Sequence, residues 1–323
     1  MEAINPILVE LTRNNELESF HRGAAAVIDA SGKLHFSLGD ITRPIFLRSA
    51  AKPLQAIPLM CSGVKLSDVE IALACGSHSG STMHIEAVSA WLARLGLSEA
   101  DLECGAHPPL DKEEAARLIR QGLAPSQLHN NCSGKHAGFL NLAQQLGAPT
   151  KGYIAADHQV QMTVSATIGD FCQADVIALP CGTDGCGIPV HALPLQALAL
   201  GVAKLAAMQA DWAERLRGAM GSHPEMIAGE GYFDTILMRR VAARILCKRG
   251  AEGVLIAMWP KMRMGLALKI DDGAGRAAEI AMAALLKIMG AATAKELSGY
   301  LEAPLLNIAG KRIGSIRAAD SFH

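Results

Sequence analysis

The alternation of apolar and polar positions divides the chain into two strand-rich ends and a helical middle. Residues 7–11 and 24–30 have the aliphatic and β-branched character of strands. Ser31-Gly32 then turns the chain into 33–38, which predicts a hairpin. Near the other end, 253–259 and 263–270 are predicted strands, and 305–308 with 312–316 predict a closing hairpin.

Apolar residues at helical spacing predict the elements between these ends. A helix is expected from about Ser49 to a break near Pro58, and Ser67-Asp68 caps a short one over 69–74. Residues 96–128 are polar and helical in pattern, and 190–250 are mostly helical. The remaining predicted helices are 82–95, 137–146, 157–172, 276–289 and 294–301, and one short strand, 175–179, leads into a glycine-rich loop at 180–189.

This order of elements predicts an α+β fold. We expect an antiparallel-dominated sheet flanked by helices, with a helical lobe inserted between the two halves of the sheet. The chain has no internal repeat or low-complexity linker, so we expect a single domain over 1–323. Within it, a sheet lobe (about 1–48 and 250–323) is distinguished from a helical middle (about 49–249).

The charge and the residue composition exclude some classes of binding partner. The net charge is −1 and only 4% of the 323 residues are aromatic, which argues against nucleic acid. No run of about 18 uncharged apolar residues is long enough to span a membrane. The first six residues lack the pattern of a secretory signal, and eight cysteines without one are expected to be reduced thiols in the cytoplasm. A small-molecule substrate is the expected partner.

The stretch Leu47-Arg48-Ser49-Ala50-Ala51-Lys52-Pro53 is the first candidate for chemistry. A serine and a lysine three residues apart lie on one face of a helix, so the amine can take the proton of the hydroxyl if it is itself uncharged. Backbone N–H groups at the start of the helix favour an oxyanion. The alternative is an N-cap serine beside a solvated lysine, although the apolar neighbours favour a buried amine.

Two cysteines in separate glycine-rich loops form a second candidate site. Cys132 is followed three residues later by Lys135, and Cys186 lies within 180–189. Two thiolates and one nitrogen would give a zinc ion three ligands and leave a fourth position open. The spacing matches no common zinc motif, and inert buried cysteines are the alternative interpretation.

Six motifs occur in order along the chain: Arg48-Ser49-Ala50-Ala51-Lys52-Pro53, Ser77-His78-Ser79, Asn131-Cys132-Ser133-Gly134-Lys135-His136, Gly182-Thr183-Asp184-Gly185-Cys186, His223-Pro224-Glu225-Met226 with Ala228-Gly229-Glu230-Gly231, and Lys269-Ile270-Asp271-Asp272-Gly273. Together they resemble the class 3, Rhizobium-type L-asparaginases of the L-asparaginase II sequence family. The resemblance covers nearly the whole chain. The fold of that family is similar to those of serine β-lactamases and of one glutaminase family.

The resemblance implies a role for each matching residue. Ser49 and Lys52 match the nucleophile and its base, and Ser77 and Lys269 match a second Ser–Lys pair. Cys132, Lys135 and Cys186 match the ligands of an accessory zinc ion, which orients the substrate rather than supplying the nucleophile. His136 and Asp184 match groups near substrate and metal, and Arg48 either binds the substrate carboxylate or forms a salt bridge. The family also implies a homodimer.

The implied reaction is hydrolysis of the side-chain amide of L-asparagine through a β-aspartyl ester. A lysine ordinarily titrates near about 10.4, so a base at neutral pH requires a shift of about three pKa units, or ~4 kcal/mol. Burial, a second ammonium and a nearby metal all act in that direction. Three other hypotheses remain open: a hydrolase that attacks with zinc-bound hydroxide, a zinc-stabilised amino-acid-binding protein without turnover, and a penicillin-recognising enzyme.

Overall fold

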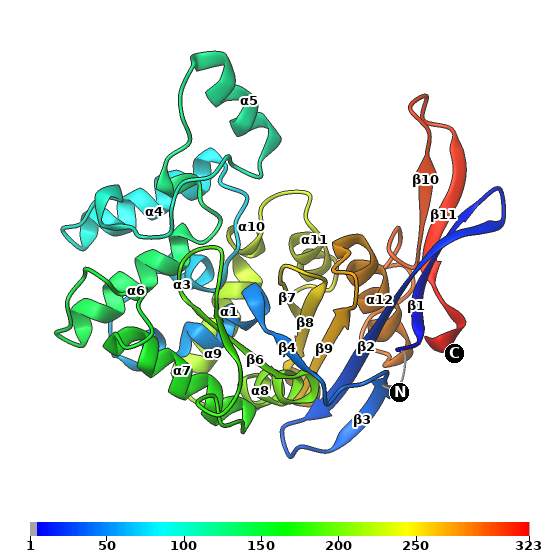
Figure 1. The fold of residues 1–323 in the computed structure, drawn as a ribbon, viewed down its shortest axis with the longest axis horizontal. Helices are drawn as coiled ribbons and strands as arrows, with labels where there is room; N and C mark the ends of the chain where they lie inside the picture. Colours follow the sequence, from blue (N-terminus) through cyan, green and yellow to red (C-terminus); the bar gives the residue numbers. More distant parts are fainter. Residues whose placement is uncertain (1–4, 323) are drawn as a thin grey trace.

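The computed structural model describes residues 5–322, so part of the N-terminal stretch discussed above lies outside it. An eight-stranded antiparallel sheet runs in the order β10-β11-β1-β2-β9-β8-β7, with β3 paired to β2 (Figure 1). Its strands are β1 (Ile7–Arg13), β2 (Glu16–Asp29), β3 (Leu34–Leu38), β7 (Leu246–Arg249), β8 (Val254–Trp259), β9 (Met264–Ile270), β10 (Glu302–Leu306) and β11 (Arg312–Ala318). The α+β class with an antiparallel sheet is confirmed.

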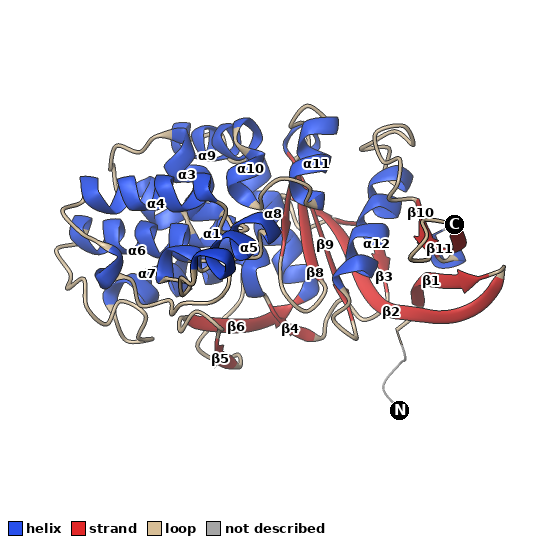
Figure 2. Cartoon of the chain, turned by 90° about the horizontal axis from the view of Figure 1, so that it is seen from above, coloured by secondary structure: helices blue, strands red, loops and turns tan. Residues whose placement is uncertain are grey.

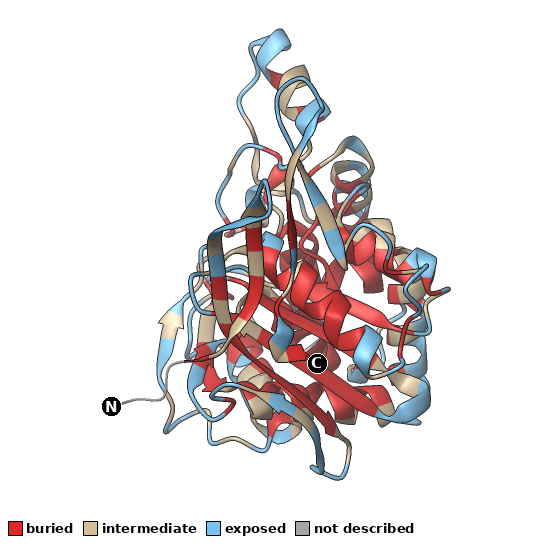
Figure 3. Ribbon diagram, turned by 90° about the vertical axis from the view of Figure 1, so that its right-hand side faces the viewer, coloured by how far each residue is buried: buried red, intermediate tan, exposed pale blue. Residues whose placement is uncertain are grey.

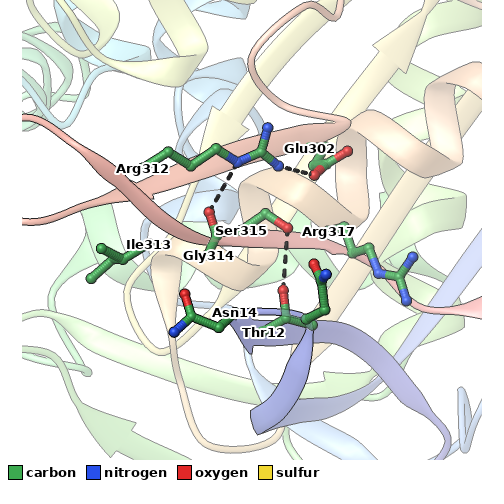
Figure 4. A pocket seen from close by; sticks show the side chains of 9 residues that line it. Thr12, Asn14, Glu302, Arg312, Ile313, Gly314, Ser315 and Arg317 are labelled. Atoms are coloured by element: carbon green, nitrogen blue, oxygen red, sulfur yellow. Dashed lines mark hydrogen bonds and ion pairs between the residues drawn. The ribbon is translucent and has the colours of Figure 1, made fainter.

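The first two strands form a hairpin that the apolar pattern did not reveal. Asn14 and Asn15 both have positive φ, 47° and 70°, the conformation that a tight hairpin turn requires and that asparagine tolerates. The hairpin tip and the β10–β11 tip project together from the body (Figure 1). A hollow of about 610 Å³ lies among these strands, and its Arg312 is already bonded to Glu302 and to the carbonyl of Gly314 (Figure 4).

Helices cover both faces of the sheet. α12 (Gly275–Ile288) packs on β9, β8, β1 and β11, and α8 (Leu195–Ala207) packs on β9, β2 and β8 from the other side (Figure 2). Of the strands beneath α12, β8 and β9 are buried along most of their length, whereas the hairpin tips are exposed (Figure 3). No helix among residues 5–322 has both the length and the apolar character needed to cross a bilayer.

The helical lobe lies beyond α8. Its segments are η1 (Arg48–Ala51), α1 (Lys52–Gln55), α2 (Ile57–Cys61), α3 (Asp68–Cys75), α4 (Thr82–Arg94), η2 (Glu99–Asp101), α5 (Lys112–Gln121), η3 (Gln127–His129), α6 (Ser133–Gln145), α7 (Gln159–Cys172), α9 (Asp211–Ser222), α10 (Pro224–Ile227) and α11 (Phe233–Arg240). Ser67 caps α3 through a reciprocal box with Glu70, as predicted. The short helices η4 (Pro260–Met262) and η5 (Asp320–Phe322) lie at the sheet.

Two predicted elements were wrong. Residues 175–179 are a turn, because the Asp175 carboxylate accepts the N–H groups of Ile177 and Ala178, and Ile177 is 94% exposed. Residues 294–301 form turns that include Gly299 at φ 83°. Residues 190–250 are mostly helical, as predicted, but two strands within them were missed: β7 and most of β6 (Pro189–Pro194). β6 pairs with β4 (Pro44–Phe46) and β5 (Cys181–Thr183) in a small second sheet.

Close packing between α8 and β9 gives a prediction for stability. A Cβ at Gly265 would lie 2.1 Å from the Ala199 carbonyl oxygen and 2.5 Å from the Ala203 nitrogen. Backbone atoms cannot yield easily, so Gly265→Ala should lower the free energy of unfolding by about 3 kcal/mol or more in a urea titration. Gly218→Ala, in α9 and facing open space, is the control and should be neutral or slightly stabilising. Equal stability of the two variants would contradict the packing described here.

Candidate active site

Lys52 lies where three segments of the helical lobe meet. Its side chain is only 1% exposed, and Nζ donates to the carbonyl oxygens of Gly76 (2.5 Å) and Asn131 (3.5 Å). Pro53 occupies the first turn of α1, where no N–H is needed, as the sequence predicted. The amine therefore joins the start of α1 to the loop after α3 and to the loop before α6.

Burial lowers the pKa of Lys52 below its usual value. The thiol of Cys132, close enough to hydrogen-bond the amine, acts in the opposite direction, and the Lys135 ammonium lowers the pKa further. The net shift is the one that a lysine needs in order to act as a base.

Ser49 lies three residues before Lys52 and follows a strained residue. Arg48 has φ 47°, a left-handed conformation that costs a residue with a side chain roughly 1–2 kcal/mol. Neighbouring bonds hold it there: the Leu47 N–H donates to the His191 carbonyl, and Arg48 Nε donates to Asp184 Oδ1 at 2.9 Å. Strain of this kind gathers at functional sites.

The loop after α3 carries Ser77 next to the carbonyl that Lys52 holds. The backbone of the loop is fixed, because Ser77 N–H donates to Ile227 O (2.7 Å) and His78 N–H donates to Asn131 O (3.1 Å). Ser77 Oγ is buried and has no hydrogen-bond partner among the described residues. His78, which receives the Gly80 N–H at Nδ1 and lies 2.9 Å from Ser133 Oγ, is a structural residue.

The two cysteines of the glycine-rich loops meet beside Lys52. Lys135 Nζ lies 3.0 Å from Cys186 Sγ, and the Cys186 thiol hydrogen-bonds Cys132. That bond and the nearby amines of Lys135 and Lys52 hold the pKa of Cys132 well below its usual range, whereas the same bond and burial raise the pKa of Cys186. Burial disfavours the Lys135 ammonium, but the two sulfur groups raise its pKa overall.

Asp184 and Arg48 form an ion pair at the edge of this cluster. Asp184 is partly buried, which raises its pKa, but Lys135, Arg48 and the Gly185 N–H outweigh burial and lower the pKa, so the carboxylate stays ionised. The salt bridge that the sequence left as one of two roles for Arg48 is therefore present. His136 lies behind the cluster: Nδ1 is 2.7 Å from the Tyr153 hydroxyl, and the buried Nε2 has no partner among the described residues.

A third buried lysine besides Lys52 and Lys135, Lys248, approaches the cluster from β7, the edge strand of the sheet. It is 0% exposed, its Nζ donates to the Arg249 carbonyl oxygen at 2.5 Å, and burial lowers its pKa to about 7. The nearby Lys52 amine also contributes to the lowered pKa of Lys248. Sequence reasoning missed Lys248 because 190–250 was interpreted as helical. The signal was a lysine directly after the apolar run Ile245-Leu246-Cys247.

Lys269, which the resemblance paired with Ser77, has backbone carbonyl oxygens as its described partners. It is on β9, two strands from β7, and its Nζ donates to the carbonyl oxygens of Glu252 (2.5 Å) and Ile270 (2.6 Å). These bonds hold the turn that follows β7. Among the described contacts none joins Lys269 to Ser77, and their pairing stays a prediction.

The sulfur and nitrogen donors fit the chemistry of zinc. No group of three or more His, Cys, Asp or Glu side chains within 5–322 is arranged to hold a metal, but the candidate set here includes a lysine amine. Cys132, Lys135 and Cys186 converge in a buried place, and thiolate and amine donors suit tetrahedral zinc. Binding would require both thiols and the Lys135 ammonium to release protons.

The fold and the site define an α+β protein in which three buried lysines and a thiol pair converge, beside the Ser49 and Ser77 segments, between a helical lobe and a sheet edge. The chain belongs to the L-asparaginase II family, which it matches over residues 9–318. It is thereby a member of a family of hydrolases. No curated protein sequence matches it.

Two solved structures resemble the chain at low identity. A β-lactamase from Mycobacterium bovis is 16% identical, with a TM-score of 0.38, and the match covers 86% of this chain and 94% of that one. A D-alanine carboxypeptidase from Burkholderia cenocepacia is 14% identical, with a TM-score of 0.39, over 80% of this chain and 90% of that one.

The lowered pKa of Lys248 predicts a pH-dependent stability. Between its native value of about 7 and its unfolded value of about 10.4, the unfolded chain binds one more proton than the native protein. Stability therefore rises with pH across this window, by at most about 1.4 kcal/mol per pH unit from this group. Lys248→Met should remove that part of the slope in urea titrations from pH 6 to 9.5.

The control for this experiment is Lys261→Met, which changes an exposed lysine of η4 and should leave the slope as in wild type. If wild type and Lys248→Met gave parallel stability curves, Lys248 would not be a buried amine with a lowered pKa.

Proposed function

We propose that the protein is a class 3, Rhizobium-type L-asparaginase that hydrolyses the side-chain amide of L-asparagine with Ser49 as nucleophile. One observation carries the proposal: in a chain of the L-asparaginase II family, Lys52 is fully buried three residues after Ser49, with a lowered pKa. An uncharged amine one helical turn from a hydroxyl can accept its proton.

The proposed reaction has two halves. Ser49 Oγ attacks the side-chain carbonyl carbon and gives its proton to Lys52 Nζ. The C–N bond then breaks, and ammonia leaves with that proton. In the second half, water attacks the β-aspartyl ester, Lys52 takes its proton and returns one to Ser49 Oγ, and aspartate is released.

Backbone N–H groups are the proposed donors to the oxyanion. The first N–H groups of η1, which begins at Arg48, have no partner within the helix. The strained conformation of Arg48 fixes the direction of Ser49 and of these donors before substrate arrives, so no reorganisation is needed during the reaction.

Arg48 and Asp184 are the proposed contacts for the two charges of the amino acid. Their ion pair, with half-buried partners, offers an acceptor for the substrate ammonium and a donor for its carboxylate. When substrate binds, the Arg48–Asp184 ion pair would be replaced by two others, Arg48 with the substrate carboxylate and Asp184 with the substrate ammonium. Every charge would then remain paired. His136 is proposed to support the same region through its bond to Tyr153.

Cys132, Lys135 and Cys186 would hold an accessory zinc ion. When bound, zinc would supply a positive charge that orients the substrate and discourages protonation of neighbouring amines. The proton transfers assigned above to Ser49 and Lys52 belong to the chain itself. Without metal, the Lys135 ammonium beside the sulfur atoms provides the compensating charge.

The nucleophile and base are tested by ammonia release from L-asparagine and L-glutamine. Ser49→Ala should lower kcat by roughly 10³-fold or more, and Lys52→Ala by about 10²–10⁴-fold, with bound zinc unchanged in Ser49→Ala. Ser62→Ala, at the end of α2, is the matched serine control and should retain activity. Full turnover by Ser49→Ala would show that Ser49 is not the nucleophile.

Zinc removal separates the leading proposal from a zinc-hydroxide mechanism. Chelated wild type should keep measurable turnover with a raised KM, and Cys186→Ser should bind zinc at least about tenfold more weakly, with Cys61→Ser unchanged. Affinity should fall as the pH is lowered, because protons compete for the sulfur and amine donors. Complete loss of turnover on chelation, with Ser49→Ala still active when zinc is bound, would favour metal-bound hydroxide. Tight asparagine binding without ammonia release would favour a binding protein.

A further inference from the structure

Two motifs of the sequence remain without a role in the proposed reaction: His223-Pro224-Glu225-Met226 and Ala228-Gly229-Glu230-Gly231. The structure places the segment that contains them against the Ser77 loop. Ile227 O accepts the Ser77 N–H, and Glu225 O lies 2.9 Å from Nε2 of His84, the histidine stacked on His78. The segment then leads directly into α11, which packs along the free edge of β7.

Asp234, in the first turn of α11, caps this edge. It is 0% exposed, and its Oδ2 accepts the backbone N–H of Arg249 at 3.0 Å. β8 lies on the other side of β7, where Gly250 N–H bonds Val254 O. Because successive N–H groups of a strand alternate in direction, the Arg249 N–H points away from β8, and the carboxylate takes the place of a further strand.

Arg249 is thereby held at three points. Asp234 holds its N–H, Lys248 Nζ donates to its carbonyl oxygen, and its guanidinium lies 3.8 Å from the centre of the Tyr232 ring. Two of the three contacts come from Tyr232 and Asp234, at the start of α11. The third fixes where the Lys248 amine points.

Gly250, the residue after Arg249, contacts the segment that carries the proposed nucleophile. A Cβ on Gly250 would lie 2.9 Å from the Ala50 nitrogen, so the end of β7 lies directly against η1 beside Ser49. A shift of β7 along α11 would move both the Lys248 amine and this contact. A displacement of about 1 Å at a reacting group can cost on the order of 100-fold in rate.

We propose that Asp234 is a positioning residue, which fixes the end of β7, and with it the Lys248 amine, against η1 beside Ser49. This inference rests on the proposed function, because the group that it positions belongs to the proposed site. Other charged and titratable groups around Asp234 are Glu279 of α12, Cys247 and Arg249 of β7, and Tyr300.

The test compares Asp234→Ala, Asp234→Asn and wild type by steady-state kinetics and by hydrogen exchange of the Arg249 amide. Alanine removes the acceptor, so kcat should fall by about 100-fold with KM within about twofold. Asparagine keeps the shape and a neutral acceptor oxygen, so it should fold and lose less kcat. Exchange of the Arg249 amide should be fastest in Asp234→Ala and intermediate in Asp234→Asn.

Glu70→Gln is the matched control. Glu70 lies at the start of α3, and its well-buried carboxylate accepts hydrogen bonds from Arg94. The variant should lose stability without changing kcat or Arg249 exchange. Unchanged kcat in both Asp234 variants, or wild-type exchange at Arg249, would overturn the positioning role. If wild type released no ammonia, the proposed function would fail, and the exchange rates would still decide whether Asp234 anchors β7.

Discussion

The arrangement depends on burying one lysine amine. Lys52 Nζ reaches the carbonyls of Gly76 and Asn131, and in doing so it holds together the end of η1, the Ser77 loop and the Cys132 loop. Burying an ammonium without a paired carboxylate is costly, and the cost appears as a lowered pKa. A buried lysine destabilises a core that has only a structural role, but its lowered pKa makes Lys52 suited to accept a proton. The contact of Lys52 Nζ with these two carbonyl oxygens therefore serves both the fold and the proposed chemistry.

The sheet supplies the opposite wall of the site. Lys248 enters from the edge strand β7, where burial and then the nearby Lys52 amine lower its pKa. Three bonds hold the end of this strand: Asp234 at the Arg249 N–H, Lys248 at the Arg249 carbonyl, and Lys269 at the Glu252 carbonyl. The thiol pair and Asp184 balance the positive charges from the other side. The cluster therefore contains several ionisable groups, each with a neighbour that limits its charge.

The sequence predicted the parts of this site that depend on local spacing. Ser49 and Lys52 lie one helical turn apart, and the motifs at Cys132, Lys135 and Cys186 meet as the resemblance implied. Long-range pairing could not be predicted in the same way. Lys248 reaches the cluster only because β7 pairs with β8, and its neighbours in sequence look equally compatible with a helix. The left-handed Arg48 has no signature in residue type, since its conformation is set by the bond to Asp184, 136 positions away.

The same limit explains the errors in the fold. At 175–179 an apolar run resembled a strand, but the Asp175 side chain satisfies two backbone N–H groups locally, and the run remains a turn. The Asn14–Asn15 turn was missed because the polar residues 12–19 conceal a hairpin whose pairing with β11 stabilises it. In both cases hydrogen bonds, rather than hydrophobic periodicity, decide the structure.

The most direct measurement is mass spectrometry of protein quenched with acid during turnover of L-asparagine. The account predicts an aspartyl ester on the peptide that contains Ser49, and no such ester in Lys52→Ala. An active protein whose Ser49 peptide stays unmodified while another serine carries the ester would contradict it.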